Sequence, residues 1–245
     1  MLKSDLKGGE SCLKKLLDLT YVHRLLIAVL LMMTFFVLLL LLRGKHYLLF
    51  SFMCLLCSIL PAYWRFEREP IRTKTLMFIG ILIALAVAGR VPLAAIPSVQ
   101  AASFIIIIGG ISLGSELGFI TGSTTALVSN MFLGQGPWTP WQMLAWGLMG
   151  LTAGLLGKTR IKKSLLLVVI FGGVWGFLFG WIMDLWYALA YVNPLNLKSF
   201  ILAFGASVPF DALHAGANVL LLTFLYKPWE LLFNRLVQKY QLLSK

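Results

Sequence analysis

Charged residues are scarce in this sequence, and acidic ones are scarcest. Only 12% of the 245 residues are charged, and 9 Asp and Glu residues stand against 21 Lys and Arg residues. A soluble domain has about a quarter of its residues charged, so this chain is not built mainly to face water. Mean hydropathy is +0.89 and 60% of the residues are apolar, which indicates that lipid is its main solvent.

Sequence motifs for nucleotide, metal and redox chemistry are absent as well. The chain has no P-loop, no H-E-x-x-H sequence and no Cys/His cluster, so we expect neither a metal site nor a cofactor. Cys54 and Cys57 have the C-x-x-C spacing, but no histidine or acid lies near them in sequence. We interpret them as small apolar fillers. Because the chain cannot hydrolyse ATP, active transport would require partner subunits.

Long uncharged apolar runs dominate the chain instead. A helix needs about 20 apolar residues to cross a hydrocarbon layer of about 30 Å, so the longest run, 117–157, must cross twice. No small-residue cleavage site follows the first run, and we expect it to remain as a helix. These runs, with the Gly and Pro breaks between them, predict an all-α integral membrane protein of about eight transmembrane helices at 24–42, 47–64, 74–95, 101–115, 117–133, 140–157, 164–190 and 200–226.

Basic residues fall between the apolar runs rather than on one soluble face, which argues against nucleic-acid binding. With a cytoplasmic N-terminus, most of the 21 Lys and Arg residues lie on the cytoplasmic side, in the N-terminal segment, in 65–74, in 158–163 and beyond 226. The positive-inside rule therefore predicts that both termini are cytoplasmic. The connections 92–100, 134–140 and 191–199 then face outward.

Four ionisable residues fall within the predicted helices or at their ends: Arg90, Asp184, Asp211 and His214. A charge there costs at least a few kcal/mol, so each is a candidate functional residue. One interpretation is a structural ion pair between Arg90 and an aspartate, and the other is a cavity that binds a solute. Amides and aromatics at the same depth favour the cavity.

The candidate binding residues also include side chains on the outer half of the last two helices. Asp211, His214 and Asn218 share one helical face, and Pro209 just before them is expected to open the helix locally. Trp138 and Trp141 have an alternative interpretation as an interfacial aromatic belt. The full set is Arg90, Gln100, Asn130, Gln135, Trp138, Trp141, Gln142, Trp146, Asp184, Tyr187, Asp211, His214 and Asn218.

Small residues form a ridge along the predicted helix 74–95. Gly80, Ala84 and Ala88 are spaced by four residues, so they lie on one face and permit close helix approach. Such a ridge packs either against another helix of the same chain or against a partner.

One motif resembles a catalytic one. Residues 110–114 match G-x-S-x-G, with Asp and His residues later in the chain. The nucleophile elbow requires a strand-to-helix turn, whereas Ser112 lies in an apolar helix. An intramembrane serine hydrolase is therefore the disfavoured alternative, and we do not expect an enzyme.

Two unusual stretches carry a resemblance to a known family. Residues 89–100 are GRVPLAAIPSVQ, and residues 127–143 are LVSNMFLGQGPWTPWQM. A glycine-rich helix at 146–157 and the sequence PFDALHAGAN at 209–218 follow them. Across residues 72–226 the chain resembles the substrate-specific (S) component of energy-coupling factor (ECF) vitamin transporters.

This resemblance implies a six-helix core in a prokaryotic cell membrane that captures a vitamin at the outer face. The implied partners are a membrane coupling subunit and two cytoplasmic ATPases. The ridge of Gly80, Ala84 and Ala88 would contact the coupling subunit, and the loop 92–100 would cap the substrate. The two helices ahead of the core depart from the family pattern, so we divide the chain into an N-terminal extension (1–70), a substrate-binding core (71–228) and a cytoplasmic tail (229–245).

The sequence indicates the identity of the solute less clearly than it indicates the family. The Pro-Trp loop is most similar to that of cobalamin-type members, and a site rich in amides and aromatics suits a corrin ring with peripheral amides. Riboflavin, pantothenate and a queuosine precursor remain alternatives.

Overall fold

The computed structural model describes residues 49, 51–53, 55–56, 72–194 and 196–243. The chain divides into a unit Met1–His46, which lies wholly outside the described residues, and a unit Tyr47–Lys245, to which everything below belongs. The expected helix 24–42 therefore lies outside the described residues. The expected helix 47–64 is represented by the helical residues 49, 51–53 and 55–56.

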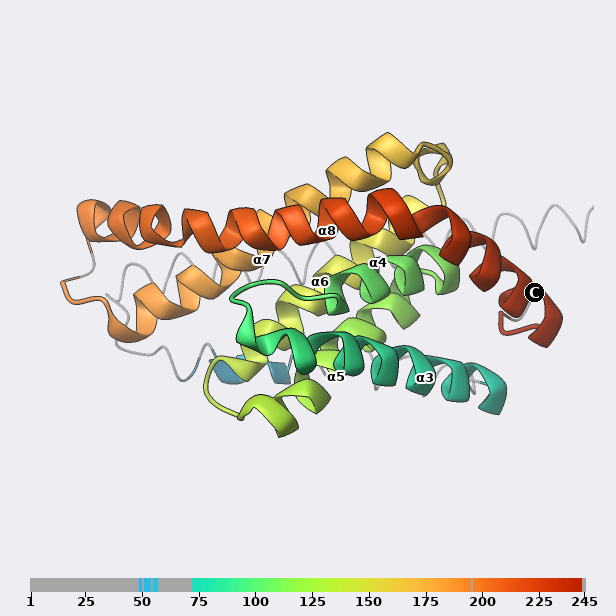
Figure 1. Cartoon of the computed structure of the whole chain (residues 1–245). Coiled ribbons are helices and arrows are strands. Elements are labelled where there is room, and N and C mark those ends of the chain that lie inside the picture. Colours follow the sequence, from blue (N-terminus) through green and yellow to red (C-terminus); the bar gives the residue numbers. More distant parts are fainter. Residues whose placement is uncertain (1–48, 50, 54, 57–71, 195, 244–245) are drawn as a thin grey trace, which may run out of the picture. The chain divides into compact units, whose positions relative to one another are not determined.

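The described residues form helices and no β-strand, which confirms the all-α prediction. Two short 3-10 helices, η1 (Pro92–Ala95) and η2 (Arg160–Lys163), lie in connections. From residue 72 onward the described α-helices, each where the sequence predicts one, are α3 (Thr73–Arg90), α4 (Ala102–Leu113), α5 (Ser115–Leu133), α6 (Thr139–Gly157), α7 (Leu165–Tyr191) and α8 (Leu197–Tyr240) (Figure 1).

Not every helix is long and apolar enough to cross a membrane by itself. Within the described residues three stretches are long and apolar enough: Thr73–Ala95, Leu165–Tyr191 and Leu197–Tyr240. The expected total of eight transmembrane helices is therefore not shown. Helix α4 has 12 residues and is only about 18 Å long. All its residues except Ser112 are buried, because α3, α5, α6 and α8 pack around it. It is a core helix rather than a lipid-facing one.

The helices alternate between two ends of the bundle. The proline end carries the connections 91–101 and 134–138 and the turn between α7 and α8, and lies at the left in Figure 1. The basic end carries the start of α3, Gly114, η2 and the C-terminal part of α8, and lies at the right. Gly114 and Gly134 end α4 and α5 with φ of 95° and 104°, a conformation that favours glycine.

Helices α5 and α6 are in backbone contact along a glycine seam. A Cβ added at Gly122 would lie 2.0 Å from the carbonyl oxygen of Trp146, and one at Gly150 would lie 2.1 Å from that of Gly118. Only glycine permits this approach. The seam fixes the position of α6, which carries Gln142 and Trp146.

Helix α8 is longer than expected. It runs unbroken through Pro209 and Pro228 to Tyr240, so the helix does not open at Pro209, and it passes the expected end at 226. Beyond that point Trp229 lies edge-on to Phe104, with ring centroids 5.4 Å apart, and Phe233 lies 5.6 Å from Phe78.

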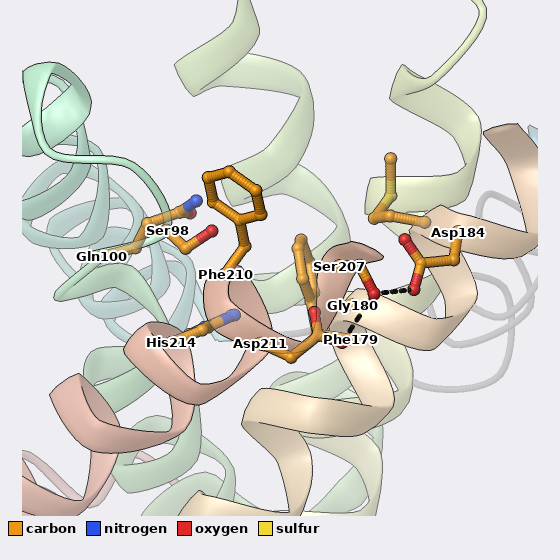
Figure 2. A pocket seen from close by; sticks show the side chains of 10 residues that line it. Ser98, Gln100, Phe179, Gly180, Asp184, Ser207, Phe210, Asp211 and His214 are labelled. Carbon is orange, nitrogen blue, oxygen red and sulfur yellow. Dashed lines mark hydrogen bonds between the residues drawn. The ribbon is translucent and has the colours of Figure 1, made fainter. Parts of the chain in front are cut away.

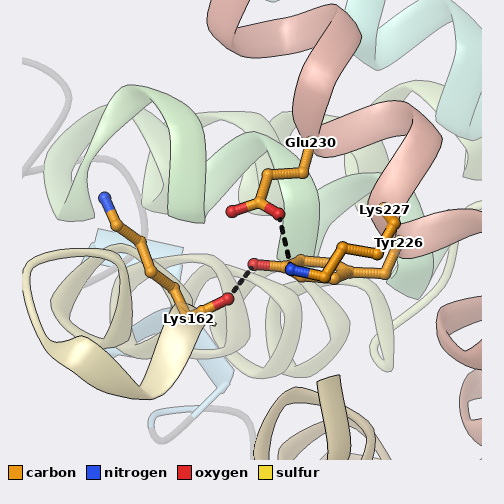
Figure 3. A network of polar contacts seen from close by, with 4 residues as sticks. All are labelled: Lys162, Tyr226, Lys227 and Glu230. Carbon is orange, nitrogen blue, oxygen red and sulfur yellow. Dashed lines mark hydrogen bonds and ion pairs between the residues drawn. The ribbon is translucent and has the colours of Figure 1, made fainter. Parts of the chain in front are cut away.

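Polar contacts secure α8 at the basic end. The Tyr226 hydroxyl donates to the carbonyl of Lys162 in η2 at 2.8 Å, and Lys227 pairs with Glu230 at 3.2 Å (Figure 3). Thr75 at the start of α3 donates to the carbonyl of Leu242. The described residues from Tyr226 onward therefore make contacts with η2, α3 and α4.

Candidate solute-binding site

A cavity of about 230 Å³ lies at the proline end, between the connection 91–101 and helices α7 and α8. Polar and aromatic side chains share its wall (Figure 2). The described residues that line it are Ser98, Gln100, Phe179, Gly180, Met183, Asp184, Ser207, Phe210, Asp211 and His214.

Two glycines of α7 let α8 approach closely beside the cavity. A Cβ added at Gly176 would lie 2.4 Å from Cα of Ala215, and one at Gly180 would lie 1.7 Å from Oδ1 of Asp211. The Asp211 side chain therefore occupies the space that a side chain at position 180 would fill. Its exposed fraction is only 4%.

Two carboxylates in the cavity share one serine. Ser207 Oγ lies 2.5 Å from Oδ2 of Asp184 and 3.0 Å from Oδ2 of Asp211 (Figure 2). It also lies 2.9 Å from the carbonyl oxygen of Phe204. The three side chains come from two helices and bring their oxygens together on one side of the cavity.

His214 forms a hydrogen bond with a buried serine. Its Nε2 lies 2.7 Å from Ser103 Oγ of α4, and that oxygen accepts a hydrogen bond of 3.1 Å from Nε1 of Trp146. The Trp146 N–H can only donate, so Ser103 Oγ is its acceptor, while the direction of the hydrogen bond between Ser103 and His214 depends on the imidazole tautomer. The ring of Phe179 packs edge-on to the imidazole, with centroids 5.0 Å apart.

Arg90 forms a separate network with neutral partners. Its Nη1 donates to Ser129 Oγ and, at 2.8 Å, to Asn130 Oδ1, while Nη2 lies 3.4 Å from Gln142 Oε1. Its guanidinium lies 4.6 Å from the ring centroid of Trp146. The proposed ion pair between Arg90 and an aspartate is therefore wrong, since the ion pair among the described residues joins Lys227 and Glu230.

The candidate binding residues thus separate into groups. Gln100, Asp184, Asp211 and His214 line the cavity. The Arg90 network, with Asn130, Gln142 and Trp146, does not line it. It contacts the cavity wall through the Trp146 ring, which packs on Phe179 with centroids 5.1 Å apart.

The remaining five candidates lie elsewhere. Gln135 is exposed, and Trp138 lies edge-on to Trp186. Trp141 is buried and donates to Ser51 Oγ at 2.9 Å. Tyr187 is half exposed, and Asn218 donates to the carbonyl of Gly172 at 3.0 Å, which joins α8 to α7 away from the cavity.

Several lining residues were missed by sequence reasoning. Ser207 lies four residues before Asp211 and so extends the polar face of α8, a signal that was available. Phe179 and Met183 look like ordinary apolar helix residues, and only the packing places them on the cavity. Ser98 has a φ of 61°, which is uncommon for a residue other than glycine.

The geometry does not support the hydrolase alternative. His214 bonds to Ser103, not to Ser112 of the G-x-S-x-G motif. Ser103 is fully buried and does not line the cavity, so a solute there cannot reach its hydroxyl.

The fold and the cavity together define a multi-pass membrane protein with a partly polar cavity near one end of a helix bundle. The family model described as "ECF transporter, substrate-specific component" matches residues 74–226, and the chain belongs to this family. No curated protein and no solved structure matches the chain. Membership makes the chain a transporter subunit with a small-molecule substrate and with ECF coupling and ATPase subunits as partners. The resemblance is confirmed for the family.

Proposed function

We propose that this chain captures a vitamin or vitamin-like solute in the cavity at the proline end and delivers it inward with a coupling subunit and two ATPases. The observation that carries the proposal is the cavity itself. Its wall combines polar and aromatic side chains, it lies in the matched region, and Ser98 and Gln100 line it from the connection that follows α3. The sequence resemblance assigns this connection to capping the substrate.

The proposal places the proline end outside and the basic end in the cytoplasm. Support comes from the charges: η2 carries Arg160, Lys162 and Lys163, and the end of α8 carries Arg235 and Lys239. The positive-inside rule assigns such a concentration to the cytoplasmic side.

The small-residue ridge is the proposed contact for the coupling subunit. Gly80, Ala84 and Ala88 are all exposed on α3, and a Cβ added at Gly80 would meet no atom within 4 Å. The exposed, smooth face favours a partner over packing within this chain.

The cavity volume bears on which solute is captured. An engineered cavity of about 150 Å³ holds one benzene, and drug-sized ligands occupy about 300–1,000 Å³. At about 230 Å³ the cavity suits a solute of one or two rings. Cobalamin would require the connection 91–101 to move away, so we propose a smaller solute and keep cobalamin, riboflavin, pantothenate and queuosine precursors as test compounds.

The test is uptake. Cells that lack other vitamin importers would receive this chain together with coupling and ATPase subunits, and accumulation of each labelled solute would be measured. We expect ATP-dependent uptake of one solute, abolished when this chain is omitted. The absence of uptake for every solute, with all subunits assembled, would contradict the proposal.

A further inference from the structure

Hydrogen-bond donors are too few on the acidic side of the cavity. Ser207 Oγ has three oxygen neighbours, from Asp184, Asp211 and the backbone of Phe204. A serine hydroxyl has one hydrogen, so it can donate to only one of them. Both carboxylates lie within hydrogen-bond distance of this one hydroxyl, so when both are ionised they repel each other unless positive charge or further donors are supplied.

An amide oxygen opposite them also lacks a donor. Oε1 of Gln100 is buried and has no hydrogen-bond partner within the part of the chain that the structure describes. Gln100 comes from the connection 91–101, whereas the aspartates come from α7 and α8. Gln100 and the two aspartates therefore line one cavity from separate elements, and a buried acceptor left unpaired is costly.

The protein's own cations do not supply the missing charge. The described lining residues include two carboxylates and no lysine or arginine. Arg90 bonds to Ser129, Asn130 and Gln142 and packs on Trp146, away from Ser207. His214 has its Nε2 on Ser103.

Aromatic rings form the rest of the wall. Phe179 and Phe210 both line the cavity, and Figure 2 shows them beside the acidic residues. Rings of this kind pack on flat apolar groups and attract cations through their faces.

We propose that the solute is a small organic cation, with an ammonium or cationic ring at Asp184 and Asp211 and a flat apolar part against Phe179 and Phe210. This inference rests on the proposed function, because it assigns a chemical class to the same site. A neutral solute would supply hydrogen-bond donors without the balancing charge, and an anion would add to the repulsion.

The experiment uses the purified full chain in nanodiscs and three probes that share one ring. Pyridoxamine carries an ammonium group where pyridoxine carries a hydroxyl and 4-pyridoxate a carboxylate, and thiamine serves as a permanent cation. Thermal midpoint and calorimetric affinity are measured for each. We expect at least one of the two cations to bind, and pyridoxamine to bind about 10-fold or more tightly than pyridoxine, as a charge-assisted hydrogen bond would give.

Variants locate the effect. Asp184→Asn and Asp211→Asn keep the side-chain shape and should each reduce the cation preference by about 10-fold or more. Glu230→Gln removes a carboxylate at the basic end and should leave the cation preference unchanged. Equal or tighter binding of pyridoxine or 4-pyridoxate, a preference that survives both substitutions, or no binding of either cation would overturn the inference. The probe comparison on the unmodified chain stands even where a variant fails to fold.

The outcomes separate this inference from the proposed function. Saturable binding and uptake of riboflavin, pantothenate or cobalamin, without a cation preference, would overturn the inference and leave the proposed function standing. Preferential binding of a cation without uptake by the assembled transporter would contradict the proposed function and leave this inference standing.

Discussion

Individual residues divide between those that bond within the bundle and those that line the cavity, although the sequence presents them as one set. Arg90 and Asp211 are both buried charged residues, with exposed fractions of 6% and 4%. Arg90 is surrounded by neutral acceptors and an aromatic ring, while Asp211 lines the cavity. Two similarly buried charged residues therefore lead to different expected effects when they are changed.

Replacing Arg90 should mainly cost stability. Arg90→Met leaves Asn130 and Gln142 without their shared donor, and hydrogen bonds to a charged group contribute about 1.5–3 kcal/mol each. The thermal midpoint in detergent should fall well below that of Asp211→Asn, which should weaken solute binding instead. A normal midpoint with lost affinity in Arg90→Met would place Arg90 in the binding site.

At the scale of whole helices, glycine has opposite roles on two faces of the bundle. In α5 and α6 it permits backbone contact inside the protein, whereas at Gly80 in α3 it leaves an open surface. Sequence spacing alone cannot separate the two, because both faces show small residues at helical intervals.

Alanine substitutions should distinguish these roles. At Gly122 the new Cβ would meet the backbone of Trp146, and overpacking costs about 1–3 kcal/mol, so the thermal midpoint should fall. In Gly80→Ala the new Cβ has no atom within 4 Å, so the substitution should increase helix stability by about 0.5–1 kcal/mol. A tolerated Gly122→Ala would mean that the seam is looser than its contacts indicate.

Large residues on the ridge should uncouple binding from transport. Ala84→Trp and Ala88→Trp place bulk on the exposed face of α3, so the isolated chain should still bind solute while ATP-driven uptake falls sharply. Phe224→Trp adds bulk at another exposed position and should leave uptake intact. Uptake that survives both ridge substitutions would exclude this face as the coupling contact.

For the whole molecule, the cavity lies where two parts of the described bundle meet. Helices α3 to α6 form one part, and α7 and α8 pair extensively along their length as the other. The lining residues belong to the connection 91–101 and to α7 and α8, so the N-terminal extension supplies none of the described ones. It contacts the core through Ser51, which accepts the hydrogen bond of Trp141.

Removing the N-terminal extension up to about Glu67 should therefore preserve solute binding. A chain that begins near Glu67 retains every described lining residue, so its affinity should match that of the full chain. Its thermal midpoint should fall, since Trp141 loses a buried partner, and Ser51→Ala in the full chain should reproduce part of that fall. Loss of affinity in a truncated chain that remains folded would show that the extension helps to form the cavity.

The sequence by itself determined the all-α class, the places of the six core helices and the family. Apolar runs and their breaks depend on local composition, and the long Pro-Trp stretch is distinctive without any structure. It also indicated four residues that line the cavity, of which Asp184, Asp211 and His214 are conspicuous as polar groups in apolar helices, and Gln100 lies in the proline-containing connection.

Only the tertiary structure decided which polar residues meet. In the structure Arg90 is separate from the aspartates, and Phe179 lines the cavity. Ser103 and His214 form a hydrogen bond although they are more than a hundred residues apart in sequence. It also showed that α8 continues past Pro228 into the packed bundle. These features depend on backbone approach at Gly176 and Gly180 and on which helix faces pack together, and such contacts between distant segments are not encoded in local periodicity.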